Sequence, residues 1–441
     1  MPAGVKRVLL VMMQPPGSSG VMGLIYDKLL PFLDHEGWEL HFAGPLPELA
    51  SVLTEKVGCS SSRLHYTRNL SLSLRFSVLK NRQNGKSVRY WAYAALQFAS
   101  LVVEKIFRHN SSACLVNGLR RSILAADAQW NYDLIAGKSP DFRILDAVAD
   151  LASFMHKPLV AMIDDPHGKR DGQEFIPCDR ERQKQVLDQC CGAVFMSPMT
   201  RDRYVTSGLV DGAKAYSLTD SFPTARRLYR PGRSVLPRVE GDSRSCPGSR
   251  ALRAVHLGML PEWRPIDALF TAFRDYPIDL QIDFYGYVYP EARRVIQADT
   301  RLRQSIRSWR SVGYEESHDL AEDSDVLFVV IGPRHLDNQP SKFFEYLGHS
   351  KPIIVLGPQG NPIEAIIHRL GIGVYCDILL PQSIASGIET VSREYESFRK
   401  AFSKNSLLIE AYSDRSVALR WSEYLDQIAR CQLRRRVASI T

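Results

Sequence analysis

The sequence reads Asp337-Asn-Gln-Pro-Ser-Lys-Phe-Phe-Glu-Tyr-Leu-Gly-His-Ser-Lys-Pro352 directly before an apolar segment, Ile353-Ile-Val-Leu356. Pro340 and Ser341 predict the start of a helix, because proline fits the first turn and a serine side chain can cap free backbone amides. The remaining amides lie at the positive end of the helix dipole, where a phosphate group binds well. The segment therefore predicts an anion site followed by a buried strand.

The predicted helix has two faces when its residues are spaced by 100°. Its apolar face contains Phe343, Phe344 and Leu347, and its polar face contains Lys342, Glu345, Tyr346 and His349. Lys342 can neutralise a diphosphate, and the Glu345 carboxylate can accept hydrogen bonds from two neighbouring sugar hydroxyls. The alternative is an ordinary amphipathic helix that binds no ligand.

At these residues the sequence resembles the donor-binding signature of GT-B glycosyltransferases, in particular the family 4-like and exopolysaccharide-type enzymes. That signature has two acidic residues separated by seven others, and Asp337 and Glu345 take these two places. Asp337 is one methylene shorter than the glutamate of the family pattern. The resemblance implies that Asp337 and Glu345, together with Ser341, Lys342 and Tyr346, bind a nucleoside diphosphate sugar.

Apolar runs alternate with helix-length segments along the chain, which predicts an α/β fold with mostly parallel sheets. The pattern restarts once, so we expect two Rossmann-like domains, and the resemblance implies a GT-B arrangement with the two sheets facing each other across a cleft. The predicted parts are an acceptor-binding domain at 1–228, a linker or mobile loop at 229–250, a nucleotide-sugar domain at 251–405, and a helix with a tail at 406–441 that crosses back to the first domain. The first domain is expected to close with a strand at 217–223, and the last helix to run from about 406 to 431.

The second domain opens with the strand-like run Arg253-Ala-Val-His-Leu-Gly258. In family 4-like enzymes, an arginine directly after this glycine and a lysine about six residues after it hold the donor diphosphate. Here Met259 stands at the arginine position, and Arg264 can replace the lysine. The resemblance thus implies that Gly258 and Arg264 bind the donor, while Lys342 restores the missing positive charge.

A glycine-rich loop, Pro15-Pro-Gly-Ser-Ser-Gly-Val-Met-Gly23, follows the first apolar strand. It lacks the G-x-G-x-x-G spacing of dinucleotide sites, so no dinucleotide cofactor is expected. GT-B enzymes carry a comparable turn, and the resemblance implies that this one approaches the donor phosphate or the acceptor. The residues concerned are Gly17, Ser18, Ser19 and Gly20. The alternative is a flexible turn without a ligand.

A polar segment, Asp164-Asp-Pro-His-Gly-Lys-Arg-Asp171, follows the strand-like run 159–163. Ligands of open α/β sheets bind at such carboxyl ends of strands. Sugar transfer with inversion needs a group that takes the proton of the acceptor hydroxyl, whereas front-side transfer with retention does not. The candidate bases are Asp165 first, His167 second and Asp164 third. A metal site made of the same side chains is a weaker interpretation, and an ordinary turn with Asx hydrogen bonds is the structural alternative.

The composition fits a two-domain globular protein, because 441 residues with 45% hydrophobic side chains suffice for two packed cores. No stretch approaches the roughly 20 apolar residues of a membrane-spanning helix, and the early apolar run lacks a signal-peptide cleavage site. The eight cysteines show no metal-binding spacing, so a reducing cytoplasm is expected. No cofactor and no metal are expected, since GT-B transferases generally stabilise the leaving diphosphate with helix dipoles and cations.

The net charge of +8 is unevenly distributed. Between Val57 and Val103 the sequence has no Asp or Glu but seven Lys and Arg residues, and the end of this stretch is rich in aromatic residues. We expect residues 57–103 to hold the protein at an anionic membrane surface, since each basic group there contributes on the order of 1 kcal/mol. A core helix beside a solvated basic loop is the alternative, and no motif supports nucleic acid as a partner.

Together these features predict a glycosyltransferase that moves a hexose-type residue from a nucleoside diphosphate sugar, such as a UDP-sugar, to a lipid-linked or other saccharide acceptor. The reaction would belong to exopolysaccharide or glycoconjugate synthesis. Two alternatives stay open: a non-hydrolysing nucleotide-sugar epimerase of the same architecture, and a non-catalytic relative that serves as a membrane assembly partner. The base, the sugar, the acceptor and the stereochemical outcome depend on the shape of the cleft.

Overall fold

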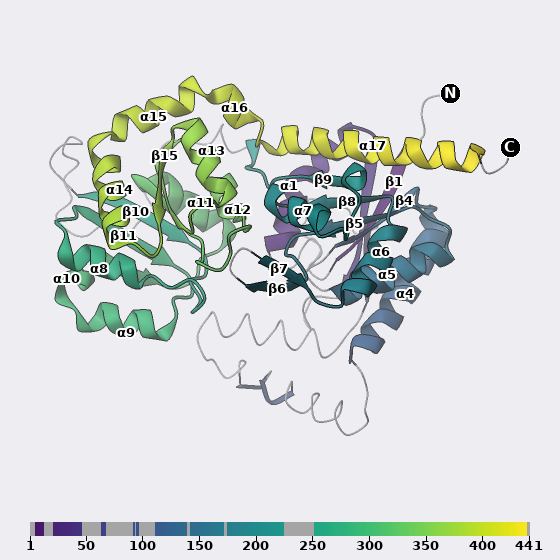
Figure 1. Ribbon diagram of the computed structural model, residues 1–441, viewed down its shortest axis with the longest axis horizontal. Helices are drawn as coiled ribbons and strands as arrows, with labels where there is room; N and C mark the ends of the chain where they lie inside the picture. Colours follow the sequence, from purple (N-terminus) through teal and green to yellow (C-terminus); the bar gives the residue numbers. More distant parts are fainter. Residues whose placement is uncertain are drawn as a thin grey trace. The chain divides into compact units, whose positions relative to one another are not determined.

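The computed structural model describes residues 5–12, 21–45, 63–67, 91–92, 94–96, 111–138, 142–171, 174–224 and 251–438. The chain forms two compact units, whose elements are labelled in Figure 1. Unit 1 contains Met1–Asp220 and the C-terminal segment Asp414–Thr441, and unit 2 contains Ser221–Ser413. The predicted linker at 229–250 lies outside the described residues.

The sheet of unit 1 joins seven strands in the order β3-β2-β1-β4-β5-β8-β9, and each neighbouring pair is parallel. The strands are β1 (Lys6–Val11), β2 (Trp38–Pro45), β3 (Leu64–Thr67), β4 (Leu134–Lys138), β5 (Leu159–Ile163), β8 (Gly192–Phe195) and β9 (Ala215–Ser217). Strands β4, β5 and β8 are buried along their whole length, as expected for a parallel sheet that is covered on both faces.

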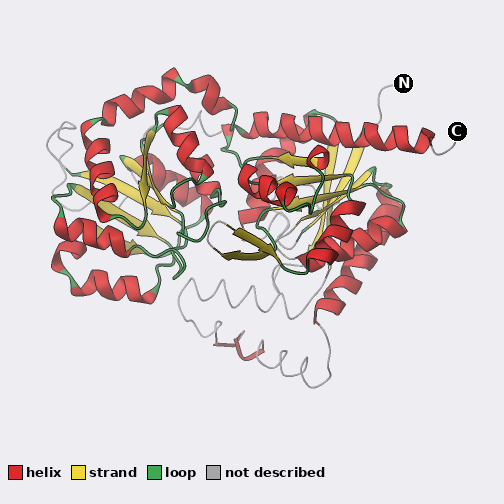
Figure 2. Ribbon diagram, in the orientation of Figure 1, coloured by secondary structure: helices red, strands yellow, loops and turns green. Residues whose placement is uncertain are grey.

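Helices cover both faces of this sheet (Figure 2). They are α1 (Val21–His35), α4 (Ser111–Trp130), α5 (Phe142–Phe154), α6 (Arg180–Gln189), α7 (Pro198–Thr206) and α17 (Asp414–Ala438), with a 3-10 turn at Gly212–Lys214 and an antiparallel hairpin of β6 (Gly168–Asp171) and β7 (Glu174–Pro177). One hydrophobic core contains side chains of α1 and α17, and the other contains side chains of α4, α5 and α6. Helix α17 thus packs on unit 1 although it follows unit 2 in the sequence.

The sheet of unit 2 joins six parallel strands in the order β12-β11-β10-β13-β14-β15. They are β10 (Leu252–Leu257), β11 (Leu280–Tyr285), β12 (Ile306–Trp309), β13 (Val326–Val330), β14 (Ile353–Gly357) and β15 (Gly373–Asp377). The helices are α8 (Asp267–Asp275), α9 (Pro290–Ala298), α10 (Thr300–Ser305), α11 (Tyr314–Asp323), α12 (Ser341–Leu347), α13 (Pro362–Leu370), α14 (Pro381–Arg393), α15 (Tyr395–Lys404) and α16 (Ser406–Glu410). The strand order reverses between β10 and β13, which is where such sheets bind ligands.

The two parallel sheets with helices around them confirm the predicted α/β class. Two local predictions are wrong. The predicted strand at 217–223 ends at Ser217, and Phe222 beyond it forms an isolated bridge with Ser413. The predicted single helix at 406–431 is divided into α16 and α17, because the chain between them leaves the helix and the Tyr412 carbonyl accepts a hydrogen bond from the Phe222 amide.

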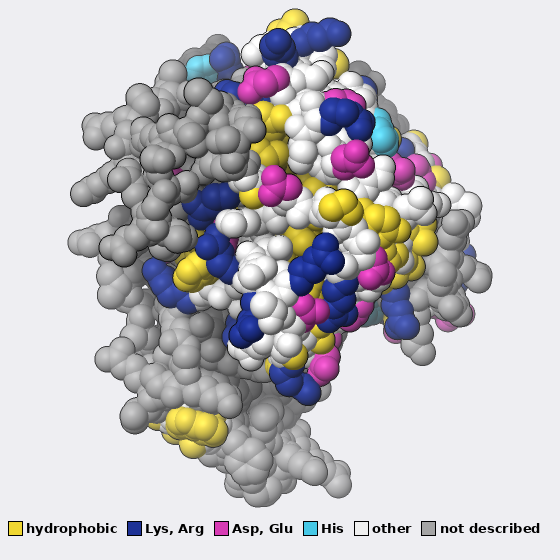
Figure 3. All heavy atoms as spheres, turned by 90° about the vertical axis from the view of Figure 1, so that its left-hand side faces the viewer, with side chains coloured by type: hydrophobic (Ala, Val, Ile, Leu, Met, Phe, Trp, Pro, Cys, Tyr) yellow, Lys and Arg dark blue, Asp and Glu magenta, His cyan; other side chains and the backbone are white. Residues whose placement is uncertain are grey.

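The predicted glycine-rich ligand loop and most of the predicted membrane-binding stretch lie outside the described residues: Gly17, Ser18, Ser19, Gly20 and the larger part of 57–103. No helix in the described part of the chain is long and apolar enough to cross a membrane. On the face drawn in Figure 3, Lys and Arg side chains are interspersed with Asp and Glu and with apolar side chains. The membrane-binding stretch therefore stays a prediction.

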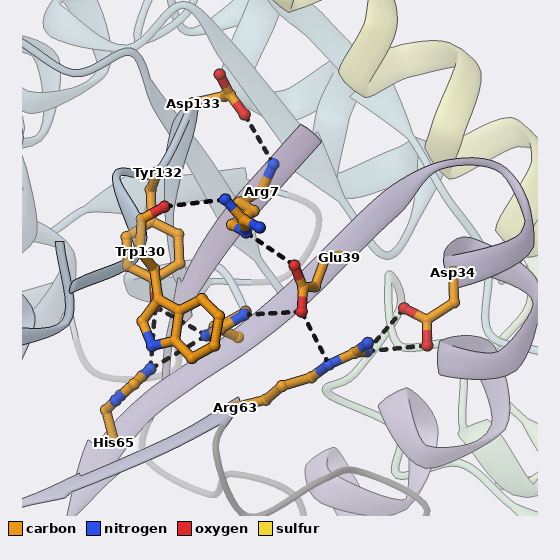
Figure 4. A network of polar contacts seen from close by, with 9 residues as sticks. Arg7, Asp34, Glu39, Arg63, His65, Trp130, Tyr132 and Asp133 are labelled. Carbon is orange, nitrogen blue, oxygen red and sulfur yellow. Dashed lines mark hydrogen bonds and ion pairs between the residues drawn. The ribbon is translucent and has the colours of Figure 1, made fainter. Parts of the chain in front are cut away.

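A buried polar cluster lies beside β2 and the edge strand β3 of unit 1 (Figure 4). The Tyr132 hydroxyl lies 2.9 Å from His41 Nδ1 and 2.9 Å from His65 Nε2, and the two nitrogens are 3.2 Å apart. Glu39, on the same strand as His41, accepts a hydrogen bond from Arg7 Nε at 2.8 Å. Burial lowers the pKa of His41 to about 4 and also lowers the pKa of His65. Both rings are therefore neutral at pH 7, so the hydroxyl can donate to one ring and accept from the other.

Acid is expected to destabilise the protein through these two histidines. Since their pKa values in the folded chain lie below the ordinary value of 6.5, the unfolded chain binds more protons as the pH falls. The stability that they contribute is complete above about pH 6.5 and is lost as the pH falls towards about 4. For His41 the loss at pH 5 is at most about 2 kcal/mol, which denaturant unfolding at pH 7 and pH 5 measures.

The matched variant replaces both histidines by glutamine (His41→Gln with His65→Gln), because glutamine keeps hydrogen-bonding groups but does not titrate in this range. Its stability should fall less between pH 7 and pH 5 than that of the wild type. His35→Gln, at an exposed position of α1, is the control and should leave the pH dependence unchanged. Equal pH dependence in the wild type and the double variant would contradict a role for the cluster.

Candidate functional site

The carboxyl end of β10 is the centre of the candidate donor site. Gly258, directly after this strand, has a φ of 146°, a conformation that favours glycine. Apart from its two chain neighbours, no described residue has an atom within 4 Å of the position that a Cβ would take there, so this side of Gly258 is open. The preceding amide, that of Leu257, donates a hydrogen bond of 3.1 Å to the Tyr346 hydroxyl, which fixes α12 beside it.

Helix α12 contributes an ion pair to this end of the sheet. Lys342 Nζ lies 2.7 Å from Glu345 Oε2, and the two residues are one turn apart. The Glu345 side chain is buried, whereas the Lys342 side chain is 30% exposed. Lys342 Nζ also lies 5.8 Å from the centroid of the Tyr314 ring, within the range of a cation–π contact. The two predicted donor-binding charges of the helix therefore lie together.

Two details of the predicted helix are wrong. The predicted apolar residues Phe343, Phe344 and Leu347 are buried, but Glu345 and Tyr346 are buried as well. A helix of seven residues is enclosed on several sides, so the spacing of its side chains does not separate a core face from a solvent face. The cap residue is Pro340 rather than Ser341, and proline has no side-chain oxygen that could accept hydrogen bonds from the first amides.

Arg264 and Lys342 act on the same buried histidine, His256 of β10. Its Nδ1 lies 3.0 Å from the Phe328 carbonyl, so this nitrogen carries the proton. Burial, assisted by the positive charges of Arg264 and Lys342, lowers the pKa of His256 to about 4. Arg264 Nη1 donates a hydrogen bond of 3.3 Å to the carbonyl of Met259, the residue after Gly258, and the Tyr346 hydroxyl joins the helix of Lys342 to the Leu257 amide. The two predicted diphosphate-binding cations therefore both lie near the end of β10. The sequence pattern gave no signal for His256.

One buried side chain holds the loop that bears Asp337. Asn361 is the cap residue of α13, where its Oδ1 accepts a hydrogen bond of 2.9 Å from the Ile363 amide. Its Nδ2 donates to the carbonyls of Leu336 and Asn338 at 2.8 and 2.9 Å. Asp337 lies between these two residues and is itself buried. Asn361 is therefore a positioning residue for the predicted donor loop, which sequence analysis missed because asparagine before proline looks like an ordinary turn.

His349 lies just beyond α12 in a chain of polar contacts with α11. Its Nδ1 lies 2.5 Å from Glu322 Oε1, and its Nε2 lies 3.0 Å from His318 Nδ1. Although burial has the opposite effect, the hydrogen bond from His349 lowers the pKa of Glu322. The two imidazole rings stack with their centroids 5.1 Å apart. His349 thus ties the end of α12 to α11 and was not expected to do so from the sequence.

In unit 1, Asp164 has the surroundings of a base. Lys138, the last residue of β4, donates a hydrogen bond of 2.5 Å from Nζ to Asp164 Oδ1, and the Lys138 side chain is buried. Burial raises the pKa of Asp164 to about 6, although Lys138 lowers it in part. The other oxygen, Oδ2, is buried and has no hydrogen-bond partner among the described residues. Within this part of the chain, Oδ2 is therefore the carboxylate oxygen that is left to accept a proton.

Further polar residues surround this ion pair, two of them from α1. The centroid of the Tyr26 ring lies 5.2 Å from Lys138 Nζ, and burial raises the pKa of the Tyr26 hydroxyl to about 12. Lys28 Nζ lies 4.0 Å from Asp220 Oδ1, and both side chains are buried. None of Tyr26, Lys28, Lys138 and Asp220 was predicted from the sequence. Only Lys138 gave a signal that could have been used, since it is a lysine that directly ends an apolar strand.

The other two candidate bases have different surroundings. Asp165 is exposed. The His167 ring stacks on Phe142 with centroids 5.1 Å apart, and its backbone amide donates to the Tyr204 hydroxyl at 3.0 Å. The His167 carbonyl accepts a hydrogen bond from Gln183 at 2.8 Å. His167 is therefore held by packing and backbone contacts. In the regions that the structure covers, no group of three or more His, Cys, Asp or Glu side chains is arranged to hold a metal ion.

Comparison with solved structures identifies the fold as that of the GT-B glycosyltransferases, which confirms the predicted fold. A sucrose-phosphate synthase from Thermosynechococcus elongatus matches 99% of this chain and 100% of its own, with a TM-score of 0.63 at 12% identity. HepE from Anabaena, in complex with UDP-glucose, matches 96% of this chain and 99% of its own, with a TM-score of 0.60 at 12% identity. A glycosyltransferase from Rickettsia africae matches 96% of this chain and 98% of its own, with a TM-score of 0.66 at 12% identity. No protein-family model and no curated protein matches the sequence.

Replacing Asn361 by alanine removes the cap of α13 and the hydrogen bonds from Nδ2 to the donor loop. We expect the free energy of unfolding to fall by about 1–2 kcal/mol, since a lost cap alone costs about 1 kcal/mol. Amide hydrogen exchange in the loop 332–339 should become faster. Asn361→Asp is the control, because aspartate keeps the capping oxygen but loses the donor group. It should preserve α13 and still speed exchange in the loop; unchanged loop exchange in both variants would refute the positioning role.

Proposed function

We propose that the protein is a glycosyltransferase whose sugar donor, a nucleoside diphosphate sugar, binds in unit 2. The observation that carries this proposal is that Arg264 and Lys342 both lie at the end of β10, beside Gly258. Arg264 donates a hydrogen bond to the Met259 carbonyl, and the Tyr346 hydroxyl joins the helix of Lys342 to the Leu257 amide. A departing diphosphate needs positive charge around it, and these two side chains supply that charge. Glu345 would accept hydrogen bonds from hydroxyls of the ribose or the sugar, and Asp337 would contact the sugar.

A UDP-sugar is the donor that we propose, with a hexose as the transferred residue. HepE, which has the same fold over nearly the whole chain, was crystallised with UDP-glucose, with UDP, and with UDP and glucose. This likeness supports uridine as the nucleoside for the present chain. A carboxylate with an ammonium group beside it, as in Glu345 and Lys342, suits a ligand with several neighbouring hydroxyls.

The acceptor would bind in unit 1, at the carboxyl ends of β4 and β5. In the proposed step, the acceptor hydroxyl gives its proton to Asp164 Oδ2 while its oxygen bonds to the anomeric carbon of the sugar. The bond between that carbon and the diphosphate breaks, and the nucleoside diphosphate leaves with the electron pair. With a pKa near 6, Asp164 is mostly ionised at pH 7 and can take the proton. Such a displacement inverts the anomeric configuration.

A lipid-linked saccharide is the acceptor class that we infer, within exopolysaccharide or glycoconjugate synthesis. The support comes from the sequence, because the basic and aromatic stretch 57–103 suits an anionic membrane surface. The protein would then bind peripherally to the cytoplasmic face of the membrane, where such acceptors could reach unit 1.

Replacing Glu345 by alanine should lower the rate of sugar transfer by at least about tenfold, because one charged contact with the donor is lost. The measurement is the release of nucleoside diphosphate from a UDP-sugar in the presence of a saccharide acceptor. Glu389→Ala, at an exposed position of α14, is the matched control and should transfer at the wild-type rate. Equal rates for Glu345→Ala and the wild type would remove Glu345 from the site.

The same assays distinguish the two alternatives. Thermal unfolding with UDP, GDP, ADP and dTDP tests nucleotide binding, since a ligand that binds only the folded chain raises its melting temperature. A non-catalytic relative would respond to none of them. Incubation with the UDP-sugar alone tests the epimerase, which would change the donor without any acceptor.

Replacing Asp164 by asparagine should lower transfer by at least about a hundredfold, the usual contribution of a general base. In the wild type, kcat/KM should fall as the pH drops through about 6, because protonated Asp164 cannot accept a proton. Asp164→Asn leaves Lys138 as an unpaired buried charge, which by itself destabilises the fold. The double variant Asp164→Asn with Lys138→Met removes that charge as well, and its transfer rate should be lowered by the same factor.

Asp165→Asn is the rival variant, since Asp165 is the first candidate base from the sequence. A larger loss of transfer in Asp165→Asn than in Asp164→Asn would reverse the assignment. The anomeric configuration of the product, measured by NMR, is the second criterion. Retention of configuration would show that no base is needed and would contradict the role of Asp164.

A further inference from the structure

Trp263 lies in the loop between β10 and α8, five residues after Gly258, and 49% of its surface is exposed. The Arg264 guanidinium lies 4.6 Å from the centroid of the Trp263 ring, and the His335 ring centroid lies 4.7 Å away at an interplanar angle of 51°. His335 belongs to the loop that follows β13. The indole is therefore placed between the ends of the two strands where the order of the sheet reverses.

The backbone of Trp263 is held in place as firmly as its ring. A Cβ added to Gly332, which follows β13, would lie 2.4 Å from the Trp263 carbonyl oxygen, so only glycine fits there. The Arg264 amide donates a hydrogen bond of 2.9 Å to the Pro261 carbonyl, which closes a turn that contains Trp263. The exposed half of the indole thus belongs to a fixed surface rather than to a loose loop.

Folding alone does not account for this arrangement. Met259, in the same loop, is also 53% exposed, so two large apolar side chains are left in water beside a guanidinium group. Burial of an indole is strongly favourable, and large aromatic side chains that stay half-exposed next to polar groups are typical of binding surfaces. A ligand with a flat apolar face attached to an anionic group would cover the ring and contact Arg264 at the same time.

We propose that Trp263 stacks on a ring carried by the bound diphosphate, and that Arg264 contacts the diphosphate itself. The inference rests on the proposed function of unit 2 and adds a residue that fixes the orientation of the donor. Two rings have the required flat apolar face, the sugar with its C–H groups and the nucleobase. The position of Trp263 beside Arg264 and His335 suits either, and the binding experiment separates them.

Isothermal titration of the full chain with UDP-glucose, UDP and glucose 1-phosphate tests the proposal. Trp263→Leu keeps apolar volume but removes the flat ring, and should weaken the affinity for UDP-glucose at least about fivefold. Trp263→Phe keeps a ring and should stay within about twofold of the wild type. If Trp263→Leu loses affinity for UDP-glucose and glucose 1-phosphate but not for UDP, the stacked ring is the sugar. If it loses affinity equally for UDP-glucose and UDP, the stacked ring is the nucleobase.

The matched control is Phe154→Leu in unit 1. Phe154 is an exposed ring with the Arg120 guanidinium 5.5 Å from its centroid, so it repeats the chemistry of Trp263 at the end of α5. Its replacement should leave all three affinities unchanged. If wild type binds UDP-glucose and Trp263→Leu binds it equally well, the stacking proposal is overturned and the donor site survives. If wild type binds none of the three ligands, the proposed function fails and the stacking proposal fails with it.

Discussion

The hydrogen bond between the Leu257 amide and the Tyr346 hydroxyl sets the geometry of the candidate donor site. It joins the last residue of β10 to the C-terminal end of α12, and burial raises the pKa of Tyr346, so the hydroxyl stays neutral. Gly258 follows Leu257, and Lys342 and Glu345 precede Tyr346 within about one turn. Without this bond, a buried amide and a buried hydroxyl would both lack a partner, at a cost of about 1–3 kcal/mol for each. Tyr346 holds α12 against β10 through this bond, and its predicted contact with the donor stays a prediction.

The sequence allowed the fold to be predicted because parallel strands that are buried on both faces have a strong signature. Apolar runs such as 159–163 and 353–356 became β5 and β14 with little change at their ends. The errors concern segments that depend on distant partners. The break between α16 and α17 arises where the Tyr412 carbonyl meets the Phe222 amide, and nothing in residues 406–431 alone indicates such a contact.

The candidate sites were predictable by position more than by residue. From the sequence, Asp165 was the first candidate and Asp164 the third, and both follow β5 within two residues. Their surroundings differ only because Lys138, at the end of the neighbouring strand, forms its hydrogen bond with Asp164. Asn361 and His256 were missed for the same reason, since each depends on contacts with backbone groups of other segments. The spacing along the chain indicates which loops lie at the same end of a sheet. Which side chain in such a loop forms a hydrogen bond depends on the strand that lies next to it.

The ion pair of Lys138 and Asp164 limits how unit 1 can evolve, whatever reaction it serves. Loss of either partner leaves a lone charge in the core, which costs about 3–5 kcal/mol, a large part of the roughly 5–15 kcal/mol that stabilises a typical domain. A neutral pair of similar volume avoids that cost. In homologous sequences, the residues at these two positions should therefore change together. Their covariation would reveal the pair even where the rest of the chain has diverged.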